Sequence, residues 1–531
     1  MKKIFLWKFI LLVCCNSELA KEQQPDNTEK NKPDFVVVIS QNNEELEMAL
    51  ANTLVAYMQQ KTNLEFMIRK AGDVSTGLPE ILIGKTNRND SHTIYSELKD
   101  DSYKVSRMQS GNIVVAGSDI YNLVHAVDQL IAYGFDTSKD SVLHIPDFLD
   151  LHGTLKLSNF EKQGALINHR MRGVTIEKVM GQSNISNLRE IRNVRMIMQL
   201  TGEYSLNRTR SRYDVSVADL GSMCLHNGKL YFFFGDTFGG ENINLNLRSN
   251  VVAYTTDFDY TNGIIFDGYL TDAEGKAVPV TQGNFGPNES ANVDKGYEYT
   301  KIPTGALSLN GSLYMSYMSV AWWADHDYWI CNYGGIMKSE DDGATWIKLE
   351  AQWPGNSKFC QMYPSLNNNG YIYVVGITGG RKSFMRMMRV PKEKYEIFDE
   401  YEYLIGYDIG GNALWKRGSE GLYAEFPLIN SRAWEPCMMY NDYLEEWIVS
   451  YKDENGIQLY SSKRVEGPYE LMASIPYKHD IAGYYAVYMH PLLSCNNGSK
   501  LALLMSSMYP LPGIPTNIWQ TSLMEITLVK K

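Results

Sequence analysis

Three acidic residues interrupt otherwise apolar stretches of this 531-residue sequence. Asp219 lies in V-A-D-L-G, Asp236 in F-F-F-G-D-T-F and Glu435 in R-A-W-E-P-C-M-M. A charge in an apolar strand lowers stability unless it is paired or useful. Two carboxyl groups that flank one bond, one protonated and one ionised, can hydrolyse a glycosidic linkage. The pattern therefore indicates an acid–base site.

Asp219 and Asp236 are the predicted catalytic pair. Asp219 starts a strand and is expected to be solvated and ionised, as a base or nucleophile. Asp236 follows F-F-F, whose apolar surroundings would raise the pKa of its carboxyl and suit it as the acid. The carboxylates are expected to face each other across a funnel. The structural alternative is that each aspartate caps a turn at a strand end.

The other candidate residues would bind the substrate, which we expect to be a polysaccharide. Glu435 and His490 would hold sugar hydroxyls, with Arg381 nearby; alternatively, Glu435 pairs with Arg432 or Arg381, and His490 is a satisfied core residue. Aromatic residues make up 12% of the chain, with 35 Tyr and 10 Trp. The expected sugar-stacking rings are Trp322, Trp323, Trp329 and Trp434.

No metal or cofactor is expected at this site. Asp325, His326 and Asp327 have ligand side chains, but an isolated cluster in one loop is weak evidence for a metal. Five cysteines beyond the N-terminus are widely spaced and odd in number, which favours buried free thiols. No phosphate-cradling glycine loop or Ser–His–Asp constellation stands out.

These candidates must be positioned by a fold that brings distant strands together. From about Val215 onward, five hairpin units recur, each joined by an Asn-Gly-type turn such as H-N-G-K or L-N-G-S. Each unit follows an inner strand; the fifth inner strand is expected at M-H-P-L-L. The sequence therefore predicts a mainly β protein with a five-bladed β-propeller over residues 204–531. A β-sandwich is the alternative.

The stretch S-E-D-D-G-A-T-W at residues 339–346 is predicted to fold rather than to catalyse. Its Ser and Asp side chains can cap backbone groups, Gly343 suits an unusual backbone angle, and Trp346 can pack between strands. This motif is common in sialidases and other propellers, where it is structural.

A separate small α/β sandwich is predicted over residues 35–154, where strands and helices alternate, with a linker at 155–203. One expected helix covers residues 44–62, and another ends at Gly134. The series L-P-E-I-L-I-G-K-T, N-I-V-V-A-G and A-Y-G-F resembles the accessory N-terminal domain of β-hexosaminidases and α-glucuronidases. That resemblance implies a carbohydrate-active neighbour and no catalytic residues in this domain.

The N-terminus resembles an export signal. Basic residues precede a short apolar run over residues 1–19, and a polar tether follows at 20–34. Cys14 or Cys15 is a candidate lipid anchor, with simple cleavage near Ser17 as the alternative. We therefore expect an exported protein, at the cell surface, as an outer-membrane lipoprotein or in the periplasm. The net charge of −11 argues against nucleic-acid binding.

A series of motifs from Tyr204 to Lys531 resembles the bacterial domain of unknown function 4185. The series comprises D-L-G, F-G-D-T-F, Y-T-K-I-P-T-G-A, S-E-D-D-G-A-T-W, G-G-R-K-S-F-M-R-M-M-R-V, W-E-P-C-M-M-Y-N, V-E-G-P-Y-E and Y-M-H-P. Members include endo-acting D-arabinanases of glycoside hydrolase family 183, which cut mycobacterial D-arabinan. The resemblance implies that Asp219 and Asp236 are the catalytic pair. The neighbours of Glu435 depart from the usual Gly-Glu pattern.

Two functions from different classes follow from these observations. The first is an exported endo-D-arabinanase, and the second is a non-catalytic surface protein that binds glycans. Retention of both Asp219 and Asp236 favours the first. A sialidase needs three arginines and a nucleophilic tyrosine, and the spacing of Arg208, Arg248 and Arg381 gives it no clear support.

Overall fold

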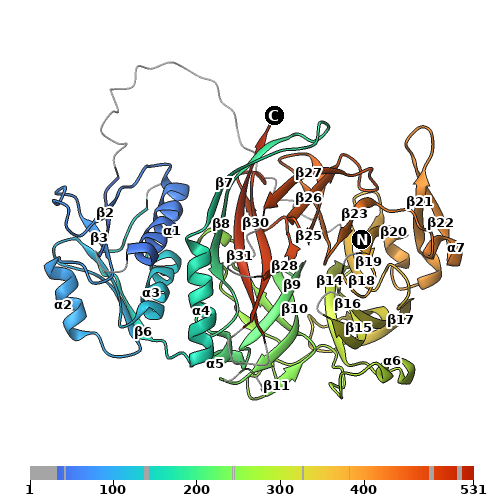
Figure 1. Cartoon of the computed structure of the whole chain (residues 1–531), viewed down its shortest axis with the longest axis horizontal. Coiled ribbons are helices and arrows are strands. Elements are labelled where there is room, and N and C mark those ends of the chain that lie inside the picture. Colours follow the sequence, from blue (N-terminus) through green and yellow to red (C-terminus); the bar gives the residue numbers. More distant parts are fainter. Residues whose placement is uncertain are drawn as a thin grey trace, which may run out of the picture.

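A computed structural model describes residues 33–40, 44–136, 143–241, 243, 245–325, 328–381, 383–476, 483–510 and 517–531. The predicted export signal, Cys14, Cys15, nearly all of the tether, His326 and Asp327 lie outside these residues. The chain folds into an N-terminal α/β layer structure followed by five β-sheets (Figure 1). Within the described ranges, no helix has the length and apolar character needed to cross a membrane.

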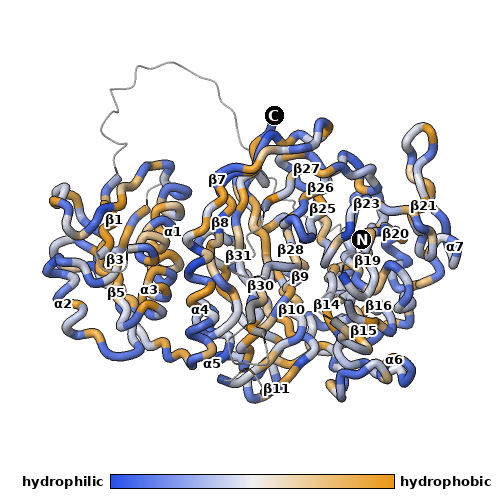
Figure 2. The backbone as a smooth tube through the Cα atoms, in the orientation of Figure 1, coloured by the Kyte–Doolittle hydropathy of each residue, from blue (hydrophilic) through white to orange (hydrophobic). Residues whose placement is uncertain are grey.

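The N-terminal part is a six-stranded sheet with helices on both faces. Its elements are β1 (Val36–Ile39), α1 (Glu44–Thr62), β2 (Ile68–Lys70), β3 (Glu80–Ile83), α2 (Asn89–Glu97), β4 (Ser102–Arg107), β5 (Ile113–Gly117), α3 (Ile120–Tyr133) and β6 (Asp150–Thr154). The strand order is β2-β1-β3-β5-β4-β6, with β4 and β6 antiparallel to their neighbours. Figure 2 shows that β1, β3 and β5 are strongly hydrophobic.

Alternation along β1 explains why that strand is apolar throughout. Val37 and Ile39 pack in the core beneath α1 and α3, whereas Val36 and Val38 pack in the core beside α2. A strand covered on both faces must be hydrophobic at every position. The predicted α/β region is therefore present, and α1 has the expected bounds. Gly134 caps α3 at φ −84°, so it ends the helix without a left-handed conformation.

Five sheets form the blades of the predicted propeller. The first blade contains β9 (Val217–His226), β10 (Lys229–Gly239), β11 (Leu245–Arg248), β12 (Val251–Thr255) and β13 (Gly268–Tyr269). The second contains β14 (Thr300–Leu309), β15 (Ser312–Asp325), β16 (Tyr328–Ser339) and β17 (Ile347–Pro354). The short α5 (Thr209–Tyr213) precedes the first blade, and η1 (Tyr260–Asn262) and α6 (Ala291–Lys295) lie before the second.

The third blade contains β18 (Gln361–Leu366), β19 (Tyr371–Ile377), β20 (Ser383–Pro391), β21 (Glu402–Tyr407), β22 (Ala413–Arg417) and β23 (Ile429–Ala433). Its loops carry η2 (Lys392–Lys394), η3 (Phe398–Glu400) and α7 (Gly418–Leu422). The fourth contains β24 (Cys437–Asn441), β25 (Glu446–Asp453), β26 (Gly456–Ser462) and β27 (Glu470–Pro476). The five-bladed, mainly β fold class is confirmed.

The fifth blade joins the two ends of the propeller and corrects the linker expected at residues 155–203. Beside β28 (Gly483–Tyr488), β29 (Ser494–Cys495), β30 (Lys500–Pro510) and β31 (Asn517–Lys530), it contains β7 (Thr175–Met180) and β8 (Leu188–Gln199). β8 pairs antiparallel with β31, from Ser522 opposite Gln199 to Lys530 opposite Leu188. Strand pairing between the two ends of the propeller closes the ring of blades.

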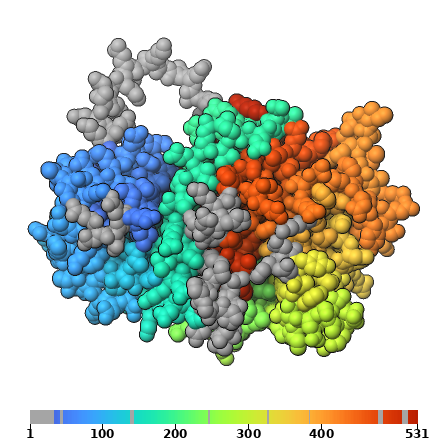
Figure 3. Space-filling model, in the orientation of Figure 1, coloured from blue at the N-terminus to red at the C-terminus, as the bar shows by residue number. Residues whose placement is uncertain are grey.

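Helix α4 (Asn159–Arg172) lies between the N-terminal layer and this fifth blade, and the two parts form one continuous body (Figure 3). Arg172 of α4 forms a buried ion pair with Asp128 of α3, at 2.5 and 2.8 Å. Gln60 of α1 and Arg195 of β8 both donate to Glu525 of β31, at 3.1 and 3.0 Å. These polar contacts tie the α/β layer to the propeller.

The stretch S-E-D-D-G-A-T-W forms the turn between β16 and β17. Asp341 accepts hydrogen bonds from the Thr345 backbone N–H (2.8 Å) and hydroxyl (2.6 Å), and Ser339 Oγ accepts one from Gly343 N (2.9 Å). Gly343 has φ +94°, and Trp346 packs edge-on against Phe233. Because the turn itself uses these groups, the motif stabilises the second blade.

Candidate active site

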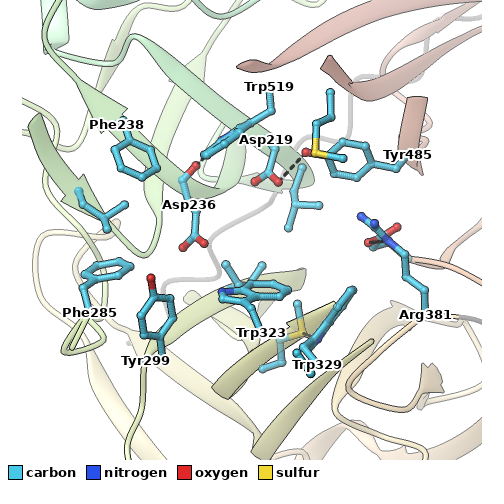
Figure 4. Close-up of a pocket in the computed structure, with 17 residues that line it drawn as sticks. Asp219, Asp236, Phe238, Phe285, Tyr299, Trp323, Trp329, Arg381, Tyr485 and Trp519 are labelled. Carbon is cyan, nitrogen blue, oxygen red and sulfur yellow. Dashed lines mark hydrogen bonds and ion pairs between the residues drawn. The ribbon is translucent and has the colours of Figure 1, made fainter. Parts of the chain in front are cut away.

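The inner strands of the blades, β9, β14, β18, β24 and β28, line a central channel. Residues near the start of four of these strands meet at a cavity of about 560 Å³ at one end of the channel (Figure 4). The cavity is lined by Asp219, Leu220, Asp236, Phe238, Leu247, Phe285, Tyr299, Ile302, Met318, Trp323, Ala324, Trp329, Arg381, Glu435, Tyr485, Met508 and Trp519.

Asp219 and Asp236 come from adjacent strands of the first blade. They therefore lie side by side on β9 and β10, which corrects the expectation that they face each other across the channel. Two breaks in the ladder place them there: the register shifts between Phe233 and Phe234, and again between Phe234 and Thr237. Such bulges re-aim side chains and occur next to active sites. Here they direct two carboxyl groups into one cavity.

Gly235 provides the space that the Asp219 carboxyl occupies. A Cβ atom at Gly235 would lie 2.3 Å from Asp219 Oδ1, a distance that no real Cβ contact allows. On the other strand, Leu220 and Gly221 adopt φ +61° and +105°. A left-handed leucine is a strained conformation, which persists where the surrounding structure enforces it. The glycine of F-G-D-T-F is thus required by close approach to the neighbouring carboxyl.

Each aspartate accepts one hydroxyl hydrogen bond. The Tyr485 hydroxyl donates to Asp219 Oδ2 at 2.7 Å, and the Thr300 hydroxyl donates to Asp236 Oδ1 at 2.5 Å. Trp519 Nε1 fixes the backbone beside them by donating to the Asp236 carbonyl at 2.8 Å. Asp219 Oδ1 is buried without a hydrogen-bond partner among the described protein groups. That oxygen is enclosed beside Gly235.

The two carboxyl groups have different proton affinities. Burial raises the pKa of Asp219 to about 7; Glu435 also raises it, whereas the Tyr485 hydrogen bond and Arg381 lower it. Burial raises the pKa of Asp236 well above its ordinary value, and the charge of Asp219 adds to the rise while the Thr300 hydrogen bond opposes it. The shift of Asp236 favours its protonated form, and Asp219, with a pKa of about 7, is partly ionised at neutral pH. Asp219 is less solvated than expected, but the predicted order of the two pKa values is retained.

Arg381 and Glu435 form an ion pair in the wall of the same cavity. Arg381 Nε lies 2.8 Å from Glu435 Oε1, and the two side chains are only 11% and 5% exposed. The rings of Trp329, Trp434 and Tyr485 surround the guanidinium, with centroids 5.3, 4.9 and 4.9 Å away. Glu435 Oε2 is buried with no hydrogen-bond partner among the described protein groups. The expected pairing of Glu435 with Arg381 therefore occurs, and it uses one of the two carboxylate oxygens.

Aromatic rings form the remaining walls. Trp323 and Trp329 pack against each other with centroids 4.8 Å apart, and Phe285 packs edge-on against Tyr299 at 5.7 Å. Trp323 and Trp329 lie on the side of the cavity opposite the two aspartates (Figure 4). Flat apolar faces beside polar groups suit a sugar, which presents apolar C–H faces and hydroxyl edges.

Three predicted site residues do not line this cavity. Trp434 packs behind Arg381, with Lys452 Nζ 3.8 Å from its ring centroid. Trp322 is half-buried and lies outside the cavity lining.

His490 lines a different cavity, of about 280 Å³, together with residues near the far ends of the inner strands, such as Leu225, Ser308 and Tyr440. The fifth inner strand is β28, which ends at Tyr488, so M-H-P-L-L follows that strand instead of forming it. His490 therefore falls at the opposite end of the channel from the two aspartates. Its Nδ1 accepts a hydrogen bond from Leu492 N at 3.2 Å, and burial lowers the pKa of its imidazole to about 4.

The sequence argument gave no role to Tyr485, Thr300, Tyr299 or Trp519. Tyr299 and Thr300 begin the motif Y-T-K-I-P-T-G-A. That motif marked the segment in the sequence but did not indicate what either residue does. Tyr485 lies five residues before His490, in a strand whose position was misjudged. Trp519 lies near the end of the chain and reaches the site only because β31 pairs within the fifth blade.

The three arginines considered for sialidase chemistry do not come together. Arg208 is paired with Glu203 at 2.9 Å, and Arg248 donates to the Asp214 and Ala277 carbonyls. Only Arg381 of these three lines the cavity. Across the described ranges, no group of three or more His, Cys, Asp or Glu side chains is arranged to hold a metal ion, and the loop with His326 and Asp327 lies outside them.

Solved structures of several glycoside hydrolases are similar to part of this chain. A GH43_1 enzyme from Xanthomonas citri in complex with xylose has 12% identity and a TM-score of 0.36, covering 59% of this chain and 90% of that chain. A family 117 glycoside hydrolase of the marine bacterium Zobellia galactanivorans has 10% identity and a TM-score of 0.36, covering 66% and 91%.

A xylan β-1,4-xylosidase from Bacillus halodurans has 11% identity and a TM-score of 0.33, covering 59% of this chain and 53% of that chain. This chain thus spans about half the length of the xylosidase.

A family model gives the more specific match. The chain matches none of the curated protein sequences compared with it. Residues 204–514, more than half of the chain, match the model described as a domain of unknown function (DUF4185). That range contains the two aspartates, the Arg381–Glu435 pair and Tyr485, and it agrees with the motif series found in the sequence. The chain therefore belongs to the DUF4185 family.

Proposed function

We propose that this protein is an exported glycoside hydrolase that cleaves internal arabinofuranosyl linkages, with the D-arabinan of mycobacterial-type arabinogalactan as its substrate. The observation that carries the proposal is the pair of neighbouring carboxyl groups with unequal pKa values in one aromatic-walled cavity. Two carboxyl groups with unequal pKa values can act as acid and base at the same pH. The choice of arabinan rests on the resemblance of the motif series to glycoside hydrolase family 183.

The two aspartates divide the reaction between them. Asp236, whose protonated form is favoured by burial, donates its proton to the glycosidic oxygen as the C–O bond breaks, so the leaving sugar departs as a neutral alcohol. Asp219, ionised, takes a proton from the attacking water or attacks the anomeric carbon itself. In the first case the water oxygen forms the new bond to that carbon. Asp219 then releases this proton to solvent, and Asp236 takes one up. In the second case Asp236, now ionised, takes a proton from a water that attacks the glycosyl–Asp219 ester, which frees the sugar and restores both carboxyl groups.

The remaining cavity residues bind and orient the sugar. Glu435 lines the cavity, where its carboxylate can accept a hydrogen bond from a sugar hydroxyl. Arg381 holds Glu435 in place through the ion pair. Trp323, Trp329 and Tyr299 provide faces on which furanose rings can stack.

The experiment is digestion of purified mycobacterial arabinogalactan, with xylan and plant L-arabinan as comparison substrates. We expect the D-arabinan to yield a ladder of oligosaccharides, which is the product pattern of internal cleavage. Asp219→Asn and Asp236→Asn variants, checked for folding by circular dichroism, should release none of it at comparable enzyme levels. Release from xylan alone would replace the arabinan assignment. Binding of glycan without release would favour a glycan-binding propeller instead.

Export and lipid anchoring belong to the same proposal. The basic and apolar residues at 1–19, with Cys14 and Cys15, support them. Metabolic labelling with a fatty-acid analogue should mark the full chain in a bacterial host, and a Cys14→Ser, Cys15→Ser double variant should lose the label. A chain that stays in the cytoplasm would overturn this part of the proposal.

A further inference from the structure

Tyr485 reaches Asp219 from the neighbouring blade. It lies on β28 of the fifth blade, whereas Asp219 lies on β9 of the first, and its hydroxyl donates to Asp219 Oδ2 at 2.7 Å (Figure 4). With Oδ2 occupied, Asp219 Oδ1 is the oxygen left without a hydrogen-bond partner among the described protein groups. Because Oδ1 is buried against Gly235, Tyr485 contacts the carboxylate oxygen that is not enclosed there and holds the Asp219 side chain in this orientation.

The position of Tyr485 is itself fixed by the structure around it. A register shift between Tyr485 and Val487 leaves Ala486 unpaired, with φ +53°. The Arg381 guanidinium lies 4.9 Å from the Tyr485 ring, whose side chain is buried. The tyrosine is thus held by a backbone bulge on one side and by a cation–π contact on the other.

The cross-strand partner of Tyr485 acts on the same segment. Tyr485 pairs with Ser506 of β30, and Ser506 Oγ accepts a hydrogen bond from the Leu220 backbone N–H at 2.6 Å. One residue of the pair holds the Asp219 side chain, and the other holds the next backbone amide. Together they stabilise the left-handed conformation of Leu220 directly after the carboxyl-bearing residue.

We propose that Tyr485 is a positioning residue of the proposed hydrolase, whose hydroxyl fixes the orientation of the Asp219 carboxyl in the cavity and keeps this carboxyl ionised as the base. The proposal rests on the proposed function and gives it a specific residue. Four groups face Asp219: Tyr485 and Arg381 favour its ionised form, whereas Glu435 disfavours it, and the Asp236 carboxyl lies on the neighbouring strand. Removing the Tyr485 hydroxyl while keeping its ring should therefore raise the pKa of Asp219.

The test is the pH dependence of kcat/KM for Tyr485→Phe. The variant keeps the ring that contacts Arg381 and loses only the hydroxyl. We expect the acidic limb of the profile to move upward by about one pH unit, because a hydrogen bond to a charged group has roughly that effect. Activity should then fall about tenfold at pH 6 and change far less at pH 9.

Tyr488→Phe is the matched control. Tyr488 lies on the same strand, is fully buried and stacks on Tyr363, but does not line the cavity. Its variant should keep the wild-type profile. A uniform loss across all pH values in Tyr485→Phe would mean that the residue only supports the fold, and an unchanged profile would mean that it does not act on Asp219.

An infrared titration separates this inference from the proposed function. The carboxyl band that disappears in Asp219→Asn belongs to Asp219, and its midpoint can be followed without any substrate. In Tyr485→Phe that midpoint should move to higher pH, whereas in Tyr488→Phe it should not. If the wild-type protein cleaves no glycan, the proposed function fails but this titration still tests the contact. An unmoved midpoint would overturn the inference even in an active enzyme.

Discussion

The two ends of the central channel are built differently. At the end with the aspartates, the strand ladders break: β9 and β10 shift register twice, β14 and β15 shift between Pro303 and Gly305, and β28 and β30 shift beside Tyr485. At the end with His490, the same strands pair without interruption, as from Ser222 to His226 and from Gly305 to Leu309.

The two ends of the channel therefore have different roles, one in catalysis and one in stability. Bulges turn polar side chains toward one cavity, in which buried oxygens of Asp219 and Glu435 have no partners among the described groups. The regular end is lined mainly by apolar residues, including Met223, Met438 and Met489. Unsatisfied buried polar groups lower stability and persist where function requires them. We therefore assign catalysis to the irregular end of the channel and packing to the regular end.

Gly235→Ala should lower activity more than the other variants that compare the two ends of the channel. Its Cβ would lie 2.3 Å from Asp219 Oδ1, so the carboxyl must move. Displacement of a catalytic group by about 1 Å can reduce turnover roughly a hundredfold. We expect a loss of that order in kcat with little change in KM, measured on the polysaccharide.

The control is Gly173→Ala, at the C-cap of α4, where the added Cβ would approach no atom closer than 3.4 Å. That variant should keep full activity. Wild-type kcat in Gly235→Ala would show that the carboxyl has room to move and that its placement is not critical.

Asp219→Asn should stabilise the folded protein at alkaline pH. The pKa of Asp219 is raised to about 7 in the folded state, so the folded chain binds its proton more tightly than the unfolded chain does. Ionisation therefore destabilises the fold progressively from about pH 4 to about pH 7, by roughly 1.4 kcal/mol for each pKa unit of difference. Asparagine removes this cost, so the gain in Tm over wild type should be larger at pH 8.5 than at pH 5.

Asp294→Asn is the comparison, because Asp294 is an exposed carboxyl in α6. Thermal scans at both pH values should show the same small effect for this variant. An equal effect of Asp219→Asn at the two pH values would contradict the raised pKa.

Asp341→Ala should have a smaller effect, confined to stability. Asp341 accepts two hydrogen bonds from Thr345 in the turn between β16 and β17, outside the cavity. We expect Tm to fall by on the order of a few degrees, with kcat unchanged in the folded fraction. Glu340→Ala, at an exposed position of the same turn, is the control. Loss of turnover at wild-type Tm would give this turn a catalytic role.

His490→Asn should have the smallest effect. Asparagine keeps an acceptor for the Leu492 backbone N–H, and the residue lies in the cavity at the regular end. We expect kcat/KM to stay within about twofold of wild type, since no proton transfer is lost. A loss as large as that of an aspartate variant would remove the distinction between the two ends of the channel.

Local sequence patterns predicted most of the fold. Asn-Gly turns identified the hairpins, as at Asn227 and Gly228, which both have positive φ. Helical periodicity gave the bounds of α1. The closure of the ring could not be predicted in this way, because β8 and β31 are more than 300 residues apart and their pairing leaves no local signal. The same non-local pairing hid the role of residues 155–203.

The candidate site was predicted in part. Asp219, Asp236, Glu435, Arg381 and Trp323 come together in one cavity, as a charge in an apolar strand suggested. Tyr485 was missed because the direction of its side chain depends on the bulge at Ala486. Alanine gives no sequence signal for the positive φ found there. His490 was misplaced because the expected fifth inner strand began several residues too late.

The most direct test of the central claim compares Asp236→Asn and Asp219→Asn on two substrates. One is D-arabinan, and the other is an aryl glycoside of an arabino-oligosaccharide, whose acidic phenol leaves without help from an acid. If Asp236 is the acid, its variant should lose roughly a hundredfold or more on the polysaccharide and little on the aryl glycoside. Asp219→Asn should lose activity on both. Equal losses on both substrates for Asp236→Asn, or wild-type rates in either variant, would contradict the division of work between the two carboxyl groups.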